Sequence, residues 1–102
     1  MSDWDYRQVD PLVHSPIRLA VLSLLTTTDE AEFTWLRDTI RTTDGNLSTH
    51  LTRLVDAEFI TADRSTGITR YRLTRAGRAG FARYVEQLET LLHPDPIRSE
   101  SP

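Results

Sequence analysis

Residues 43–73 constrain the fold of this chain more than any other part of the sequence. A helix is predicted from about residue 44 to 57, because Thr43 is a favoured capping residue and three leucines follow it at the spacing of one helix face: Leu47, Leu51 and Leu54. Two segments in which apolar and polar residues alternate come next, at residues 60–64 and 68–73, separated by a short turn that contains glycine. Any fold of the chain must therefore join a helix with an exposed polar face directly to a two-stranded ribbon.

The remaining segments predict further helices on both sides of this unit. Ser15-Pro16 is a helix start, because serine can accept a hydrogen bond from an early backbone N–H and proline has no N–H left to pair, and it predicts a buried helix over residues 16–26. Phe33 is expected in a short strand, and Thr34 is expected to cap a brief second helix. Thr74 is expected to cap a long helix that ends near residue 93. The brief helix and the helix after Thr43 are consecutive, and such a pair predicts a helix-turn-helix.

The composition of the 102 residues excludes several classes of function. There is no cysteine, which rules out a disulfide scaffold, a thiolate metal site and a cysteine nucleophile, and the three histidines are too scattered for a zinc site. No glycine-rich phosphate loop follows a strand and no Ser-His-Asp order is present, so neither an enzyme nor a bound cofactor or metal is expected. The longest apolar run, residues 19–25, is too short to cross a membrane, and the acidic residues near the start of the chain do not fit a secretory signal. We therefore expect a cytoplasmic protein.

The charges are unevenly ordered along the chain, whose net charge is −3. Acidic residues gather in residues 1–10 and 29–32, whereas residues 64–83 contain six arginines and no acidic residue. One basic stripe on an acidic molecule favours a single face for an anionic partner, although a solvated charged surface would explain the pattern as well.

The order of these elements, and the residues within them, resemble the small bacterial and archaeal winged-helix transcriptional regulators related to the MarR and ArsR groups. Four segments carry the resemblance in the family's order: Leu12–Ala20, Thr43–Leu51, Leu54–Ile60 and Tyr71–Arg78. The resemblance implies a fold that is mainly α with a small β-ribbon (α+β), a winged helix-turn-helix with a long C-terminal dimerisation helix. It also implies that the helix after Thr43 is the recognition helix and that residues 65–67 form the wing, which is shorter and less basic than in many relatives.

The predicted recognition helix presents residues suited to DNA. With its leucines inward, helical periodicity turns polar side chains outward, Thr52 among them, and Asn, Arg, Ser and Thr can pair with bases or phosphates. Asp44 has three open roles: it favours the helix dipole, holds an arginine, or accepts a hydrogen bond from cytosine. His50 lies between the inward and outward faces and is expected to have a hydrogen-bonded packing role. We predict DNA contacts from the helix and the ribbon, with the ribbon arginines on phosphates, at Thr43, Gly45, Asn46, Ser48, Thr49, Arg53, Arg64, Ser65 and Arg70.

The long last helix carries more apolar surface than so small a core can cover. We therefore expect a homodimer interface at Phe81, Val85, Leu88 and Leu92. Two glycines in the same helix predict the close approach of another backbone, at Gly77 and Gly80. A small apolar effector is expected between the N-terminal segment and this helix, as the resemblance to the MarR group implies, although the same aromatic residues could simply seal the dimer contact: Trp4, Tyr6, Phe81 and Tyr84.

The sequence therefore predicts a DNA-binding transcriptional regulator that acts as a homodimeric repressor on an inverted-repeat operator in double-stranded DNA and is released by a small apolar effector. A winged-helix module that binds another protein, without DNA contact, is the alternative, because an acidic chain suits a basic partner. The expected division is an N-terminal arm (1–10), a DNA-binding domain (11–74), a dimerisation helix (75–93) and a disordered tail (94–102).

Overall fold

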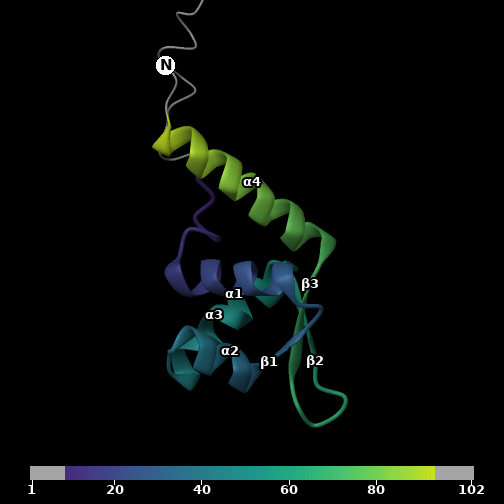
Figure 1. Ribbon diagram of the computed structural model, residues 1–102. Helices are drawn as coiled ribbons and strands as arrows, with labels where there is room; N and C mark the ends of the chain where they lie inside the picture. The colour runs from purple at the N-terminus through teal and green to yellow at the C-terminus, as the bar shows by residue number, and fades with distance from the viewer. Residues whose placement is uncertain (1–8, 94–102) are drawn as a thin grey trace, which may run out of the picture.

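Helix α1 (Pro16–Thr27) occupies the centre of the fold, and α2, α3, α4 and β3 all contact it. The computed structural model describes residues 9–93, which form four helices and a three-stranded antiparallel sheet in the order α1, β1, α2, α3, β2, β3, α4 (Figure 1). Val21, Leu22 and Leu25 of α1 are fully or almost fully buried, as expected for a helix with little polar face. Pro16 begins α1 as predicted, but the Ser15 side chain makes no capping hydrogen bond, so that part of the prediction is wrong. The fixed backbone angle of proline suits this first helical position without a side-chain cap.

The segment after α1 differs from the sequence prediction. Strand β1 (Ala31–Glu32) precedes Phe33, and Phe33 is the first residue of helix α2 (Phe33–Ile40) rather than part of a strand. Glu32, not Thr34, occupies the capping position of α2, and its side chain makes no capping bond. Both residues of β1 pair with β3, and the Phe33 N–H donates to the Thr69 carbonyl at 3.2 Å. The start of α2 is therefore fixed by the sheet and not by a local cap.

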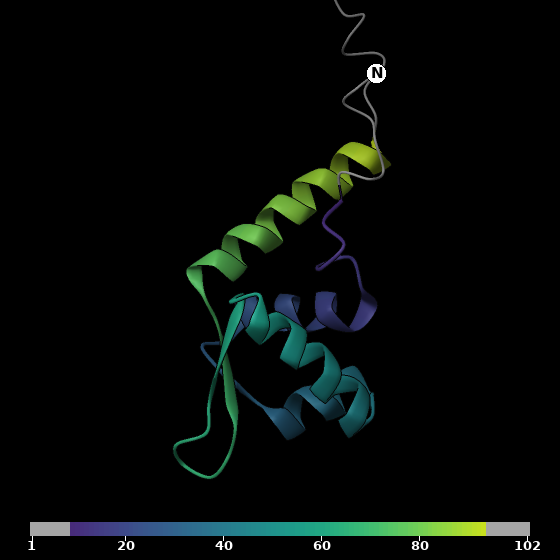
Figure 2. The same ribbon diagram turned by 180° about the vertical axis from the view of Figure 1, so that it is seen from behind.

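Helix α3 (Asp44–Asp56) and the ribbon that follows it agree with the prediction. The ribbon consists of β2 (Ile60–Asp63) and β3 (Arg70–Leu73), which pair in antiparallel register with Ala62 opposite Tyr71. β3 is the central strand, since β1 pairs along its other edge. The loop between β2 and β3 extends away from the helices as a wing, and Gly67 within it has a φ of 86°, in the left-handed region that favours glycine (Figure 2).

Helix α4 (Arg75–Leu92) crosses α1 on the side opposite to α2 (Figure 1). Thr74 caps α4 as predicted, because its Oγ1 accepts from the Gly77 N–H at 2.9 Å. The close approach of another backbone predicted at the two glycines is confirmed at Gly77 and is wrong at Gly80. A Cβ atom at Gly77 would lie 2.0 Å from the backbone oxygen of Phe59, and one at Gly80 would lie 2.6 Å from the Phe59 ring. At Gly77 the neighbour is thus a backbone, whereas at Gly80 it is a side chain.

The two ends of the chain lie largely outside the described residues, so the predicted arm and tail are not tested. Of the arm, Val9 is described and is buried in the core. No helix within residues 9–93 is both long and apolar enough to cross a membrane.

Candidate nucleic-acid interface

Helix α3 has one fully apolar face and one fully exposed polar face. Leu47, Leu51 and Leu54 are at most 2% exposed, and they anchor the helix on the core. The opposite side chains are all exposed, as predicted: Asn46, Ser48, Thr49, Thr52 and Arg53. Because the leucines fix the rotation of α3, this polar face is held outward and is free for a partner.

The start of α3 is organised by two polar contacts. Thr43 Oγ1 accepts a hydrogen bond from the Asn46 N–H at 3.2 Å, which confirms the predicted cap. Asp44 Oδ1 lies 2.9 Å from Arg37 Nη1, so of the three roles left open for Asp44 the structure shows the second, an arginine partner. The hydrogen bonds to Asp38 and Asp44 raise the pKa of Arg37 above its ordinary value. This pairing offsets the negative charge of Asp44 beside the first turn of the helix.

A hollow of about 160 Å³ lies between α3 and the ribbon. Its polar lining comes from both elements: Ser48 and Thr52 of α3, Arg64 at the end of β2, and Tyr71 of β3. Burial raises the pKa of Tyr71, and the nearby Arg64 charge acts in the opposite direction. Such a volume is well below the roughly 300 Å³ of common small-molecule sites but has room for a phosphate group between hydroxyl and guanidinium donors.

The structure separates the two ribbon arginines that the sequence places together on DNA. Arg64 lines the hollow beside α3, whereas Arg70 lies opposite Asp63 on the other face of the sheet from the buried Tyr71. Arg70 is also already paired: its Nε and Nη2 are each 3.4 Å from carboxylate oxygens, of Glu30 and Glu32 respectively. The structure therefore does not place Arg70 beside the predicted DNA-contacting residues of α3.

The wing loop is braced by its own side chains. Ser65 donates through its N–H and its hydroxyl to Asp63 Oδ1, at 2.9 and 2.7 Å, and these two bonds lower the pKa of Asp63. Arg70 Nη1 donates to Thr66 Oγ1 at 2.9 Å. Ser65 is thus engaged in shaping the turn, and the residue is exposed.

The predicted dimer residues form a stripe along α4 that is only partly covered by the chain itself. Phe81 and Leu88 pack partly buried against the core, on the side of the stripe next to the inward-facing glycines. Val85 and Leu92 are 37% and 65% exposed. The stripe therefore has a covered inner edge and an open outer edge.

The predicted effector residues are not gathered at an open site within the described part of the chain. Trp4 and Tyr6 lie outside the described residues. Tyr84 is 2% exposed, and its hydroxyl is 3.1 Å from His14 Nδ1, so the chain itself already covers this ring. His50 has the hydrogen-bonded role expected for it, with Nδ1 2.9 Å from Arg18 Nη1.

Comparison with known proteins decides the family. Residues 17–92 match the winged helix DNA-binding domain family. The chain belongs to this family. An uncharacterized protein of Methanocaldococcus jannaschii is 30% identical over 81 residues, which are 76% of this chain and 88% of that protein.

Solved structures share the predicted winged-helix fold. The transcriptional regulator homologue from Pyrococcus horikoshii OT3 matches with a TM-score of 0.84 and 18% identity, over 95% of this chain and 100% of that one. The transcriptional repressor CouR, solved bound to a 23-mer DNA duplex, matches with a TM-score of 0.73 and 24% identity, over 92% of this chain and 71% of that one. The winged-helix assignment and its α+β fold class are thus confirmed.

One further candidate for a DNA contact, Arg41, is not marked by any feature of the sequence. Arg41 ends α2 in the left-handed conformation, with a φ of 65°, and its N–H donates to the Arg37 carbonyl at 2.8 Å. Its exposed side chain lies in the turn of the helix-turn-helix, three residues before α3 begins. Only the position of this turn beside the recognition helix makes Arg41 a candidate for a phosphate contact.

Proposed function

We propose that the protein is a transcription regulator that binds duplex DNA as a homodimer and represses by occupying an inverted repeat. One observation carries the proposal: α3 holds an exposed polar face, Asn46, Thr49 and Arg53, on a fully buried leucine face, next to a hollow lined by Arg64. Asn and Arg are the side chains that pair bidentately with adenine and guanine in the major groove. Membership of the winged helix DNA-binding domain family supports the proposal.

The homodimer is proposed from the open edge of the α4 stripe. Val85 and Leu92 lie seven residues apart, so they share one helix face and leave apolar surface in water. Covering this edge with the same edge of a second copy gives a two-fold dimer, and a two-fold dimer matches two half-sites about one helical turn, roughly 34–36 Å, apart. The apolar effector at the junction with the N-terminal segment stays a prediction.

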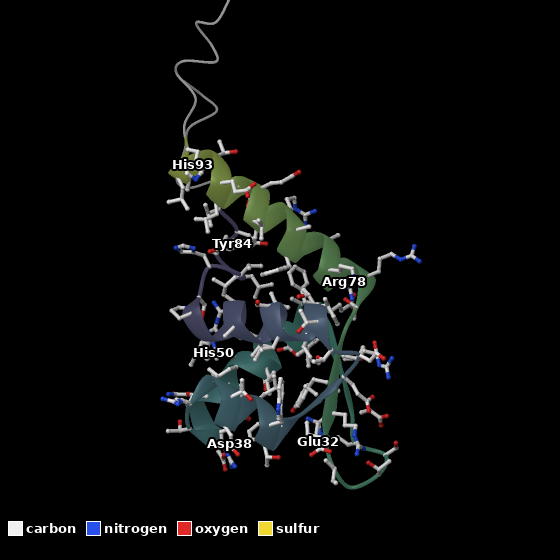
Figure 3. All side chains as sticks on the ribbon, in the orientation of Figure 1. Glu32, Asp38, His50, Arg78, Tyr84 and His93 are labelled. Carbon is white, nitrogen blue, oxygen red and sulfur yellow. The ribbon has the colours of Figure 1, made fainter. Side chains whose placement is uncertain are left out.

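Selection from a random duplex pool tests the proposal. The protein should enrich an inverted repeat, and Asn46→Ala and Arg53→Ala should each cost about 1–3 kcal/mol and relax base preference at one position of each half-site. Arg78→Ala is the matched control, because Arg78 is an exposed arginine on α4 that points away from α3 and the wing (Figure 3).

The control should leave the selected motif and its affinity unchanged. If no motif is enriched and binding to all duplexes is equally weak, the regulator proposal fails. The domain would then have to act through a protein partner.

A further inference from the structure

The side chain of Arg18 joins three parts of the molecule. From the first turns of α1, its Nε donates to the Leu12 carbonyl and its Nη2 to the Pro11 carbonyl at 3.4 Å. Its Nη1 lies 2.9 Å from Nδ1 of His50, in the middle of the recognition helix. One guanidinium thus connects the turn before α1 to α3.

This contact requires one protonation state of His50. Arginine has donors only and stays charged, so Nδ1 of His50 must be the acceptor. The ring is therefore neutral, with its proton on Nε2. A proton on Nδ1 would remove the acceptor and place two positive groups within hydrogen-bond distance of each other.

The surroundings of His50 favour the neutral ring. Burial lowers its pKa first, and the positive charges of Arg18 from α1 and Arg53 from α3 lower it further. Within residues 9–93, no carboxylate is hydrogen-bonded to this ring or paired with it. Acid therefore opposes the contact, because the two charged groups that act on the ring, Arg18 and Arg53, would repel an imidazolium.

The turn that Arg18 holds is also connected to α4. Residues 10–15 form a hydrogen-bonded turn in which the Leu12 N–H donates to Asp10 Oδ1 at 2.9 Å and the His14 N–H to the Asp10 carbonyl at 2.9 Å. The His14 side chain reaches Tyr84 of α4, so polar contacts run from α4 through this turn to α3. Figure 3 shows Tyr84 on the side of α4 that faces α1, and His50 on the other side of α1.

We propose that Arg18 is a positioning residue for DNA binding: through the neutral His50 ring it holds the recognition helix against the turn at residues 10–15, and protonation of His50 releases this hold. The DNA readout rests on the proposed function, but the hold on the turn does not. Neither side chain needs to touch DNA for the effect.

Two substitutions of His50 distinguish the loss of the hydrogen-bond acceptor from the effect of protonation. His50→Asn keeps an acceptor oxygen near the place of Nδ1 and cannot be protonated, whereas His50→Ala removes the acceptor. At about pH 8, His50→Asn should bind the selected duplex like the wild type and His50→Ala about 3- to 10-fold more weakly, the range for one lost hydrogen bond. Because the pKa of His50 is lowered, the acid arm is a titration from about pH 8 to below the ordinary histidine range, over which the wild type should weaken toward His50→Ala while His50→Asn does not. His14 and His93 remain in both variants, so they cannot produce this difference.

Hydrogen exchange in the absence of DNA provides a readout that a base contact would not change. At one pH, the amides of Leu12 and His14 should exchange several-fold faster in His50→Ala and in Arg18→Gln than in His50→Asn or the wild type. This arm works even if the protein binds no DNA, so failure of the proposed function and failure of the positioning role are distinguishable. The proposal is overturned if exchange at the turn is the same in all four proteins. It is equally overturned if wild type and His50→Asn lose the same affinity on acidification.

Discussion

The sharpest test of the interface compares two arginines of the wing that differ in their surroundings. Arg64 faces the hollow beside α3, with no ion pair among the described residues, whereas Arg70 is paired with Glu30 and Glu32 on the other face of the sheet. Each lysine or arginine on a phosphate contributes about 0.9 to the slope of log affinity against log salt. Arg64→Ala in a two-fold dimer removes two such contacts, so the slope should fall by about 1.8. If Arg64→Ala and the wild type bind equally at 1 M salt, this change of slope makes the binding of Arg64→Ala roughly 60-fold weaker at 0.1 M salt.

Arg70→Ala is the matched variant, because it removes the same side chain from the same ribbon. Its slope should equal that of the wild type, since its charge is already offset by two carboxylates. Fluorescence anisotropy of a labelled selected duplex over a KCl series measures both slopes, and circular dichroism confirms that both variants are folded. If Arg70→Ala lowers the slope as much as Arg64→Ala does, or if neither variant changes it, this assignment of the two faces of the sheet is wrong.

Three further predictions concern packing and assembly. Gly77→Ala places a Cβ against the fixed Phe59 carbonyl and should cost about 2–3 kcal/mol, or roughly 10–20 °C in thermal unfolding, while Gly45→Ala, with nothing within 4 Å, should be neutral or slightly stabilising. Equal melting of the two variants would contradict the close approach. Tyr84→Phe should cost about 0.5–1.5 kcal/mol in urea unfolding by losing the bond to His14, and no loss would show that this bond is not made in solution. Leu92→Glu should convert a sedimenting dimer into a folded monomer, since Leu92 is 65% exposed in the single chain, and an unchanged dimer would place the interface elsewhere.

Local signals predicted the elements that local chemistry determines. The caps at Thr43 and Thr74 are set by a hydroxyl and an N–H three residues later, and both were predictable from residue type and spacing. The start of α2 was not predictable, because it depends on the pairing of β1 with β3 and on the hydrogen bond from the Phe33 N–H to Thr69, which lies just before β3 and far along the chain. A phenylalanine between a strand and a helix carries no signal for which of the two it joins.

The candidate site divides in the same way. The outward face of α3 follows from helical periodicity once the three leucines are placed inward. The alternation of apolar and polar residues over 68–73 also implies that the neighbours Arg70 and Tyr71 lie on opposite faces. It could not predict that Glu30 and Glu32 lie on the same face as Arg70. The pairs Arg70–Glu32 and Arg72–Glu30 join residues about 40 positions apart.

These ion pairs help to explain how a chain with a net charge of −3 can belong to a family of DNA-binding domains. Glu30, just before β1, and Glu32, within it, lie on the outer face of the sheet, where Glu30 lies 3.0 Å from Arg72 and both acids pair with Arg70. Asp44, in the first turn of α3, is paired with Arg37. Attraction to DNA depends on the charges within about 10 Å of the phosphates at ordinary salt and not on the net charge of the chain. Among residues 9–93, Glu30 and Glu32 are paired on the outer face of the sheet, whereas Arg64 beside α3 has no ion pair. Neutralising Glu30 and Glu32 by mutation should therefore alter the isoelectric point far more than the salt slope of the proposed DNA binding.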